Sequence, residues 1–380
     1  MINITIKRKV LANELGLING FNQKTILSSD NNATNFNVIS QNNNLYLDLS
    51  FSNTEVSFWR RLTIDGEGEG EFNIQTKNMF SFINSDLDAD ISLIKNEETK
   101  NSILIKTSGY KVNISESKKE SFLVKKEEEF PLSIKLTAGE MSDIIKKVSF
   151  CIEDQKFRQN LMGMNVSYYK GQWYFVGSDS FRINVYKKQL QSNIKEDDKL
   201  DSNFIIAKRN LDDILKIVSF LKEEEEIEML FDERRVVIRT KDIYFKSLLV
   251  SEKYPDITKF YDNKGQASMR IDTKEISNDL RIFKNSADSE QQEIKLDIKS
   301  DKVAFIYEGN IEKIEKELDC EYSAKELKIH FNVFFLAEAL QNMDQEKETV
   351  IEFTGGSGPA VIKNEGVDHY RHILMPLRIN

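Results

Sequence analysis

Two glycine-rich segments are the first places to look for phosphate chemistry. GEGEGEF begins at Gly66, and TGGSGP covers residues 354–359. A phosphate-binding loop needs glycines followed by Lys-Ser/Thr at the start of a helix, because backbone amides and the lysine hold the anion together. Neither segment has that lysine, and the glutamates of the first would repel phosphate. The two segments therefore predict a flexible acidic loop and a hairpin turn, not a nucleotide site.

Histidine and aspartate could bind a metal, but their spacing does not support this. His369 and His372 lie three residues apart beside Asp368. Alternation along a strand puts the two histidines on opposite faces, no third ligand follows, and we expect both at the surface. The Asp-x-Asp-x-Asp run at 86–90 lacks the glycine and distal glutamate of a calcium loop. No nucleophile has a base at recognisable spacing, so we expect no metal, no cofactor and no catalytic centre.

The bulk composition describes a folded protein of two or three domains. The 380 residues are 40% apolar and 30% charged, with 16 Gly and 4 Pro. Cys151 and Cys320 are far apart and form no C-x-x-C pair, so the sequence predicts neither a disulfide framework nor a zinc ribbon. No stretch approaches the roughly 20 apolar residues that span a bilayer. We expect a cytoplasmic protein without a membrane segment.

One pattern occurs three times along the chain: an amphipathic helix, a hairpin and a second helix. The first helices begin near Ile6, Leu136 and Ile271, the hairpins lie near Phe36, Val166 and Leu296, and the second helices begin near Thr76, Ala207 and Phe331. The repeat recurs at steps of about 130 residues, the size of a domain. Charged stretches at 125–130 and 260–266 place domains at 1–125, 131–253 and 264–380. Any α+β chain also shows helices and hairpins in some order, so the pattern alone leaves the triplication open.

The net charge of −9 argues against free binding to a polyanion. Charge sums describe a whole surface, however, and a basic face can coexist with an acidic one. The expected helices carry an excess of cations, namely Lys7, Arg8, Lys9, Lys77, Lys146, Lys147, Lys208, Arg209, Lys274, Arg281 and Lys284. Any single one of them is more simply a solvated helix position, but as a set they predict a positive surface.

Three motifs carry a resemblance to a known family. The chain ends in HILMPLRIN, a segment from Arg158 reads RQNLMGMNVSYYKGQWYFVGSDSFRINVY, and another from Ser251 reads SEKYPDITKF. In their order along the chain, from Arg158 through Ser251 to the C-terminal motif, they resemble the beta subunits of bacterial DNA polymerase III, the sliding clamps. His330 to Val333 add a shorter match, whereas the first third of the chain matches only in its repeat pattern.

The resemblance implies a non-catalytic α+β protein of three clamp domains, each with two inner helices backed by antiparallel sheets. Two subunits would join head to tail into a homodimeric ring around duplex DNA and make a polymerase processive. The polymerase and the clamp loader would bind through short peptide motifs. The alternative is a clamp-fold scaffold for protein interactions that does not close a ring.

The resemblance also implies site residues. For DNA it adds Gln155 and Arg158 to the helix cations, although Gln159 and Asn160 replace tyrosines of the family. A partner-peptide pocket would be formed by Leu161, Ser178, Ser180, Phe181, Arg182, Ile183, Pro255, Lys259, Phe260, Asn332, Ile373, Leu374, Met375, Pro376, Leu377 and Arg378. Departures at Ser180 and Phe181, where the family has Gly-His, and at Lys259, where it has Arg, indicate a shifted peptide preference.

For the contact between subunits, the resemblance places Ile282 and Phe283 opposite Lys111 and Val112 of the other subunit. Obligate interfaces are enriched in apolar residues, which favours this interpretation. Adjacent large apolar residues at a helix end could equally belong to a core.

Overall fold

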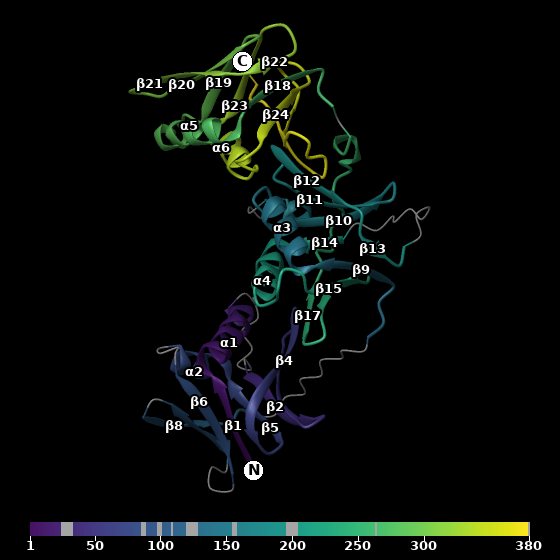
Figure 1. Cartoon of the computed structure of the whole chain (residues 1–380), viewed down its shortest axis with the longest axis vertical. Coiled ribbons are helices and arrows are strands. Elements are labelled where there is room, and N and C mark those ends of the chain that lie inside the picture. Colours follow the sequence, from purple (N-terminus) through teal and green to yellow (C-terminus); the bar gives the residue numbers. More distant parts are fainter. Residues whose placement is uncertain are drawn as a thin grey trace. The chain divides into compact units, whose positions relative to one another are not determined.

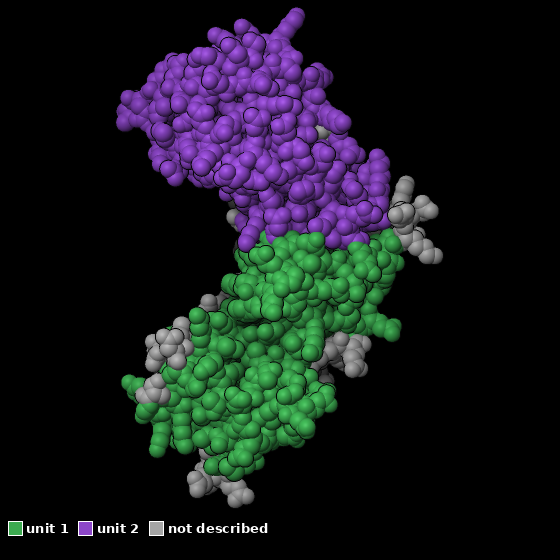
Figure 2. Space-filling view, in the orientation of Figure 1, with its two compact units in different colours: residues 1–142, 191–194, 209–249 green, residues 143–190, 195–208, 250–380 purple. Residues whose placement is uncertain are grey.

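The computed structural model describes residues 1–23, 33–84, 89–96, 101–107, 109–118, 128–153, 158–194, 204–262 and 264–378. The chain forms two compact units (Figure 2). The first comprises residues 1–142, 191–194 and 209–249, and the second comprises 143–190, 195–208 and 250–380. The finer boundaries 1–125, 131–253 and 264–380 stay a prediction.

The first unit contains a sheet of 13 described strands (Figure 1). Its main path is β13-β9-β15-β16-β17-β4-β1-β6-β7-β8, and β2, β3 and β5 join beside β4. The strands are β1 Ile2–Lys7, β2 Ala33–Gln41, β3 Asn44–Ser52, β4 Val56–Glu67, β5 Gly70–Gln75, β6 Asp90–Lys95, β7 Ser102–Thr107, β8 Tyr110–Ser115, β9 Leu132–Thr137, β13 Gln191–Ser192, β15 Glu226–Phe231, β16 Arg235–Arg239 and β17 Ile243–Leu248.

The second unit contains a nine-stranded sheet, β14-β10-β11-β12-β26-β25-β24-β18-β22, and a four-stranded sheet, β21-β20-β19-β23, within the described ranges. The strands are β10 Gly163–Tyr169, β11 Gln172–Ser178, β12 Arg182–Lys188, β14 Phe204–Ala207, β18 Ala267–Asp272, β19 Glu293–Ile298, β20 Lys302–Glu308, β21 Lys313–Asp319, β22 Glu321–Tyr322, β23 Leu327–Asn332, β24 Glu348–Phe353, β25 Ala360–Asn364 and β26 Tyr370–Leu374.

The helices lie where the sequence pattern predicts them. They are α1 Arg8–Gln23, α2 Thr76–Ile83, α3 Ala138–Ser149, α4 Lys208–Val218, α5 Thr273–Ser286 and α6 Val333–Gln341, with short 3₁₀ turns at Gln159–Leu161 and Thr258–Phe260. Each apolar stripe is buried, as Leu11, Leu15 and Ile18 illustrate in α1. In the part of the chain that the structure describes, no helix is long and apolar enough to cross a membrane.

The predicted hairpins are also confirmed. Asn42 and Asn43 between β2 and β3, and Lys170 and Gly171 between β10 and β11, all have positive φ. Two consecutive left-handed residues define the tight turn whose twist matches the flanking strands, and asparagine and glycine adopt it at low cost. The TGGSGP segment joins β24 to β25 as expected.

The glycines of GEGEGEF have a structural cause and are not a free acidic loop. Gly66 lies within β4, paired with Ile4 of β1. A Cβ atom at Gly66 would lie 2.3 Å from the Asn3 carbonyl oxygen, and one at Gly68 would lie 1.8 Å from that of Met1. Only glycine permits such an approach of two backbones, and both residues have positive φ.

Candidate functional site

Arg182, at the start of β12, lies at the centre of the contacts that hold the surface where most predicted pocket residues lie. Only 7% of it is exposed. Its Nε donates to Asp179 Oδ2 at 2.8 Å and its Nη1 to Glu338 Oε2 at 2.6 Å. Its guanidinium carbon lies 4.3 Å from the ring centre of Phe335. A planar guanidinium can make these charge-assisted and stacking contacts together, so Arg182 ties the β11–β12 turn to α6.

The turn before Arg182 is held by its own polar side chains. Asp179 Oδ1 accepts from the backbone N–H groups of Phe181 and Arg182, both at 3.0 Å. Ser178 Oγ donates to the Arg182 carbonyl at 2.9 Å and accepts from the Ser180 N–H at 3.1 Å. Ser180 has a φ of +80°, a conformation that serine rarely adopts. The result is a rigid turn that presents the Phe181 ring to solvent.

Segment 375–378 passes beside this turn from one sheet to the other. β26 pairs with β12, with Ile373 opposite Ile183. Beyond the strand, the Met375 N–H donates to the Phe181 carbonyl at 2.9 Å, and the Leu377 N–H donates to the His330 carbonyl of β23 at 2.8 Å. Backbone hydrogen bonds therefore fix the positions of Met375 and Leu377.

A buried apolar cluster lies under part of this surface. Leu161, Ile183 and Ile373 pack in it with Tyr254 and Ile257, and Phe260 packs against it. Two large apolar side chains of the predicted pocket are exposed instead, Phe181 by 60% and Met375 by 40%. The predicted pocket residues thus divide into a buried floor and an exposed apolar rim, the arrangement that a short apolar peptide can cover.

The remaining predicted pocket residues have different environments. Pro255, Lys259 and Arg378 are exposed, while Leu374 is buried. Asn332 caps α6, since its Oδ1 accepts from the N–H groups of Phe334 and Phe335 at 2.9 and 3.2 Å.

Phe335 is a residue that the sequence reasoning missed. Its ring centre lies 6.2 Å from that of Phe181. Its position three residues after the Asn332 cap, in the first turn of α6, could have indicated that it lies near the predicted pocket.

Many of the predicted DNA-facing cations are exposed, and some of the set have protein partners. The exposed ones are Lys7, Lys77, Lys146, Arg158, Arg209, Lys274 and Arg281, and Lys284 is half-buried. Lys7 pairs with Asp90 at 2.8 Å, and Arg209 pairs with Glu55 at 2.7 Å. Lys208 Nζ donates to the Ile152 carbonyl at 3.3 Å. Gln155 lies outside the described residues.

Arg8 is a correction to the predicted DNA-facing set. It is 3% exposed, and its Nε and Nη2 donate to the carbonyls of Ile83 and Phe82, each at 2.8 Å. A cation at the end of α2 satisfies carbonyls that lack helical partners and favourably meets the helix dipole. Because the guanidinium is committed there, we remove Arg8 from the DNA-facing set.

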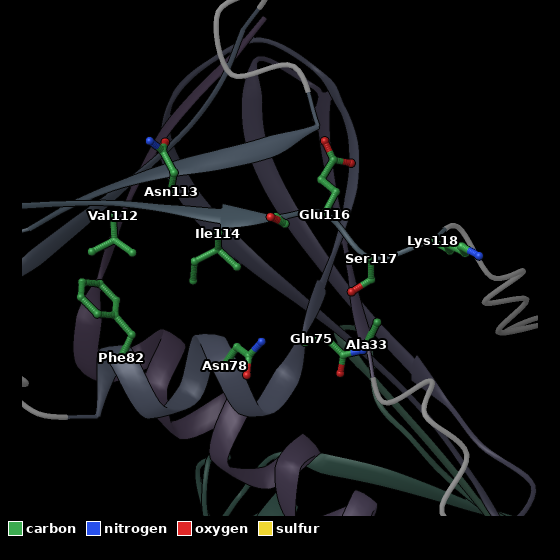
Figure 3. A pocket seen from close by; sticks show the side chains of 11 residues that line it. Ala33, Gln75, Asn78, Phe82, Val112, Asn113, Ile114, Glu116, Ser117 and Lys118 are labelled. Atoms are coloured by element: carbon green, nitrogen blue, oxygen red, sulfur yellow. The ribbon is translucent and has the colours of Figure 1, made fainter.

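The predicted subunit contact has an open cavity on one side. β8 is the last strand on its path in the first sheet. The space between β8 and α2 has a volume of about 620 Å³. Figure 3 shows Val112 and Ile114 on the strand and Phe82 and Asn78 on the helix. Lys111 is exposed.

On the other side of that predicted contact, adjacent residues of α5 differ in burial. Ile282 is 57% exposed, whereas Phe283 is 1% exposed with its ring centre 6.5 Å from that of Phe305. Phe283 is therefore a core residue, which corrects its predicted place in the interface.

The expectation that both histidines lie at the surface is wrong, because only His369 is exposed. His372 is fully buried, and its Nδ1 lies 2.6 Å from Asn184 Oδ1 and 3.7 Å from Cys151 Sγ. Burial, and secondarily the charge of Arg182, lowers the pKa of His372 to about 3. Within the described ranges, no group of His, Cys, Asp and Glu could hold a metal ion.

Comparison with known proteins gives consistent matches. A family model described as DNA polymerase III beta subunit, central domain, matches residues 135–256, and the model of the C-terminal domain matches 262–378. Beta sliding clamps of Staphylococcus aureus N315 and Staphylococcus epidermidis are each 24% identical over 389 positions, which cover 100% of both chains.

Solved structures match over nearly the whole chain. The DNA polymerase III subunit beta of Pseudomonas aeruginosa has a TM-score of 0.84 at 19% identity and covers 99% of this chain and 100% of its own. The DNA polymerase sliding clamp of Bacillus subtilis has a TM-score of 0.84 at 17% identity, with 100% of both chains covered. At these identities, the structural matches show a shared fold.

Proposed function

This chain belongs to the beta subunit family of DNA polymerase III, the sliding clamps, and from that premise we propose that it encircles duplex DNA and holds a replicative polymerase on it. It is a non-catalytic processivity factor. The observation that carries the proposal is the match of two clamp-domain models in order across residues 135–378, together with a clamp fold over the full length. We assign it to the cytoplasm.

The DNA contact is proposed to be sequence-independent. The cations Lys7, Lys77, Lys146, Lys147, Arg158, Lys208, Arg209, Lys274, Arg281 and Lys284, together with Gln155, would face phosphates. Lys and Arg that meet phosphates supply an electrostatic attraction that reads no base. The affinity of these side chains for DNA can stay low, because a closed ring is held on the DNA by topology.

The partner-peptide site is proposed on the surface around Arg182. Apolar side chains of a polymerase or clamp-loader peptide would cover the floor of Leu161, Ile183 and Ile373 and contact the rim of Phe181 and Met375. Support comes from the exposure of those two rim residues above a buried apolar cluster. Methionine adapts its shape to different ligands, which suits a site that serves several partners.

The homodimer is proposed to form head to tail, with Ile282 of one copy against Lys111 and Val112 of the next. Support comes from the 57% exposure of Ile282 and from the open cavity beside Val112. Fully burying a large exposed aliphatic side chain, here against Val112 and its neighbours Ile114 and Phe82, contributes about 1.5–3 kcal/mol.

Retention on DNA of different topology tests the proposed function. After loading, the protein is expected to stay on nicked circular DNA at high salt and to slide off the same DNA once it is linearised. An inactive loader serves as the control for adhesion without encirclement. Equal loss from circular and linear DNA would instead favour the scaffold that closes no ring.

A further inference from the structure

Two adjoining hollows lie in the second unit at the ends of β11 and β12, away from the surfaces assigned above. One, of about 460 Å³, is lined by Gln172, Lys187, Lys188, Gln189, Asp368 and His369, with Tyr186. The other, of about 380 Å³, shares Gln172 and Gln189 and adds Lys170 and Gly171. Because the two hollows share these lining residues, we treat them as one surface and call it the strand-end groove.

The groove gathers positive charge on a chain whose net charge is −9. Lys170, Lys187 and Lys188 line it with one lining acid, Asp368, and Lys170 Nζ also lies 3.9 Å from Asp262 Oδ2. Burial lowers the pKa of His369, and the charges of Lys147, Lys188 and Lys347 lower it further, against the opposite effect of Asp143. The positive charges of several lysines therefore act together on the His369 ring in the groove.

The side chains around this point are held in place. The Tyr186 hydroxyl donates to Asp143 Oδ2 of α3 at 3.0 Å, and the Tyr186 ring meets the His369 ring edge-on with centres 5.2 Å apart. The Lys187 N–H donates to the His369 carbonyl at 2.7 Å. Lys147 Nζ, on the same helix as Asp143, lies 4.8 Å from the centre of the Tyr370 ring. The groove is thus connected to the cationic helix α3.

The lining favours a phosphate over a peptide. Lysines and glutamine amides supply charge and hydrogen-bond donors, and the aromatic and aliphatic anchors that give peptides their affinity are few among the lining residues. A phosphodiester needs only donors and positive charge. An oligonucleotide backbone also offers successive anions that could occupy both hollows.

We propose that the strand-end groove binds phosphates of the DNA backbone and extends the DNA contact from α3 to the ends of β11 and β12. This inference rests on the proposed function, because the DNA is the duplex that the ring encircles. Lys187, Lys188 and Lys170 would make the phosphate contacts, and Tyr186 would position His369 beside them.

The first test follows the His369 ring by NMR in the full-length protein at low salt. A His369→Gln variant assigns its signal among the three histidines. A 20-base-pair duplex of arbitrary sequence is expected to shift the His369 signal and to leave that of buried His372 unchanged. Octaglutamate at the same anion concentration is expected to have a much smaller effect. An equal response to octaglutamate, or none to the duplex, overturns the proposal.

The second test measures duplex affinity against salt for Lys187→Ala/Lys188→Ala. Each lost phosphate contact lowers the slope of log K against log [salt] by about 0.9, so the slope should fall by about 2. The matched control is Lys299→Ala/Lys325→Ala, which removes two exposed lysines from the part that carries the four-stranded sheet. Equal slopes for the two variants overturn the proposal.

Encirclement of DNA and phosphate binding by the strand-end groove can be disproved independently of each other. A ring that stays on circular DNA while the lysine variants leave the salt slope unchanged disproves the groove alone. If the wild type is not retained on circular DNA, encirclement is disproved, and the duplex titration still tests the groove.

Discussion

His372 makes the second unit sensitive to acid by a calculable amount. Its Nδ1–H donates to Asn184 Oδ1, and its Nε2 has no hydrogen-bond partner among the described residues. Protonation would bury an unpaired charge, so the folded protein keeps the ring neutral and its pKa is about 3.

The sign follows from proton binding. The unfolded chain takes up a proton on His372 near its ordinary pKa of 6.5, whereas the folded chain does so only near 3. Stability is therefore full above about pH 7 and falls as the pH drops from 6.5 towards 3. At about 1.4 kcal/mol per pH unit, the loss between pH 7 and pH 5 is about 2 kcal/mol.

The variant His372→Asn removes this titration while keeping an amide donor near Asn184. Unfolding by urea at pH 7 and pH 5 measures the effect, with Trp59→Phe in both proteins. Trp173 of β11 then reports on the nine-stranded sheet that also contains β26. Other titrating groups contribute equally to the two proteins and cancel in the comparison.

Wild type is expected to lose about 2 kcal/mol more than His372→Asn between the two pH values. Circular dichroism at pH 7 establishes that the variant is folded. Equal losses in both proteins would refute the assignment of a buried neutral imidazole.

The other predictions concern contacts and backbone. Ile282→Asp is expected to yield a folded monomer in sedimentation, because Ile282 is exposed. Phe283→Ala should instead lower the free energy of unfolding by about 3–5 kcal/mol, because Phe283 is in the core. If neither variant sediments as a monomer, the proposed interface is rejected. Phe181→Ala should weaken binding of a polymerase peptide about tenfold or more in calorimetry without changing the urea midpoint, and unchanged affinity would exclude Phe181 from the rim. Gly68→Ala should destabilise the first unit by more than about 2 kcal/mol in urea, because its Cβ would overlap the Met1 carbonyl; an unchanged midpoint would contradict that contact.

The helices and the hairpins of this fold could be predicted from the sequence because they follow from local rules. Apolar spacing located the helices, and the Asn42-Asn43 and Lys170-Gly171 turns located two hairpins. The family resemblance rested on motifs from Arg158 onward, which overlap both matched domain models.

Burial of individual residues could not be predicted in the same way. Arg8 looked like one more helix cation until α2 placed its last carbonyls beside it. Ile282 and Phe283 are neighbours in sequence, and only the packing of α5 against the sheet separates an exposed side chain from a core one. His372 is buried because β26 lies between β12 and β25, a pairing between segments far apart in the sequence.

The position of β26 also affects how the protein is made. Asn184 and His372 meet across 188 residues of chain, so on the ribosome β12 emerges long before the strand that covers its edge. Until then β12 offers unpaired amide and carbonyl groups to any other strand. The nascent second unit is thus exposed to mispairing for the time needed to synthesise those residues, roughly ten to forty seconds at bacterial rates. Molecular chaperones that shield open strand edges should therefore matter most for the yield of this unit.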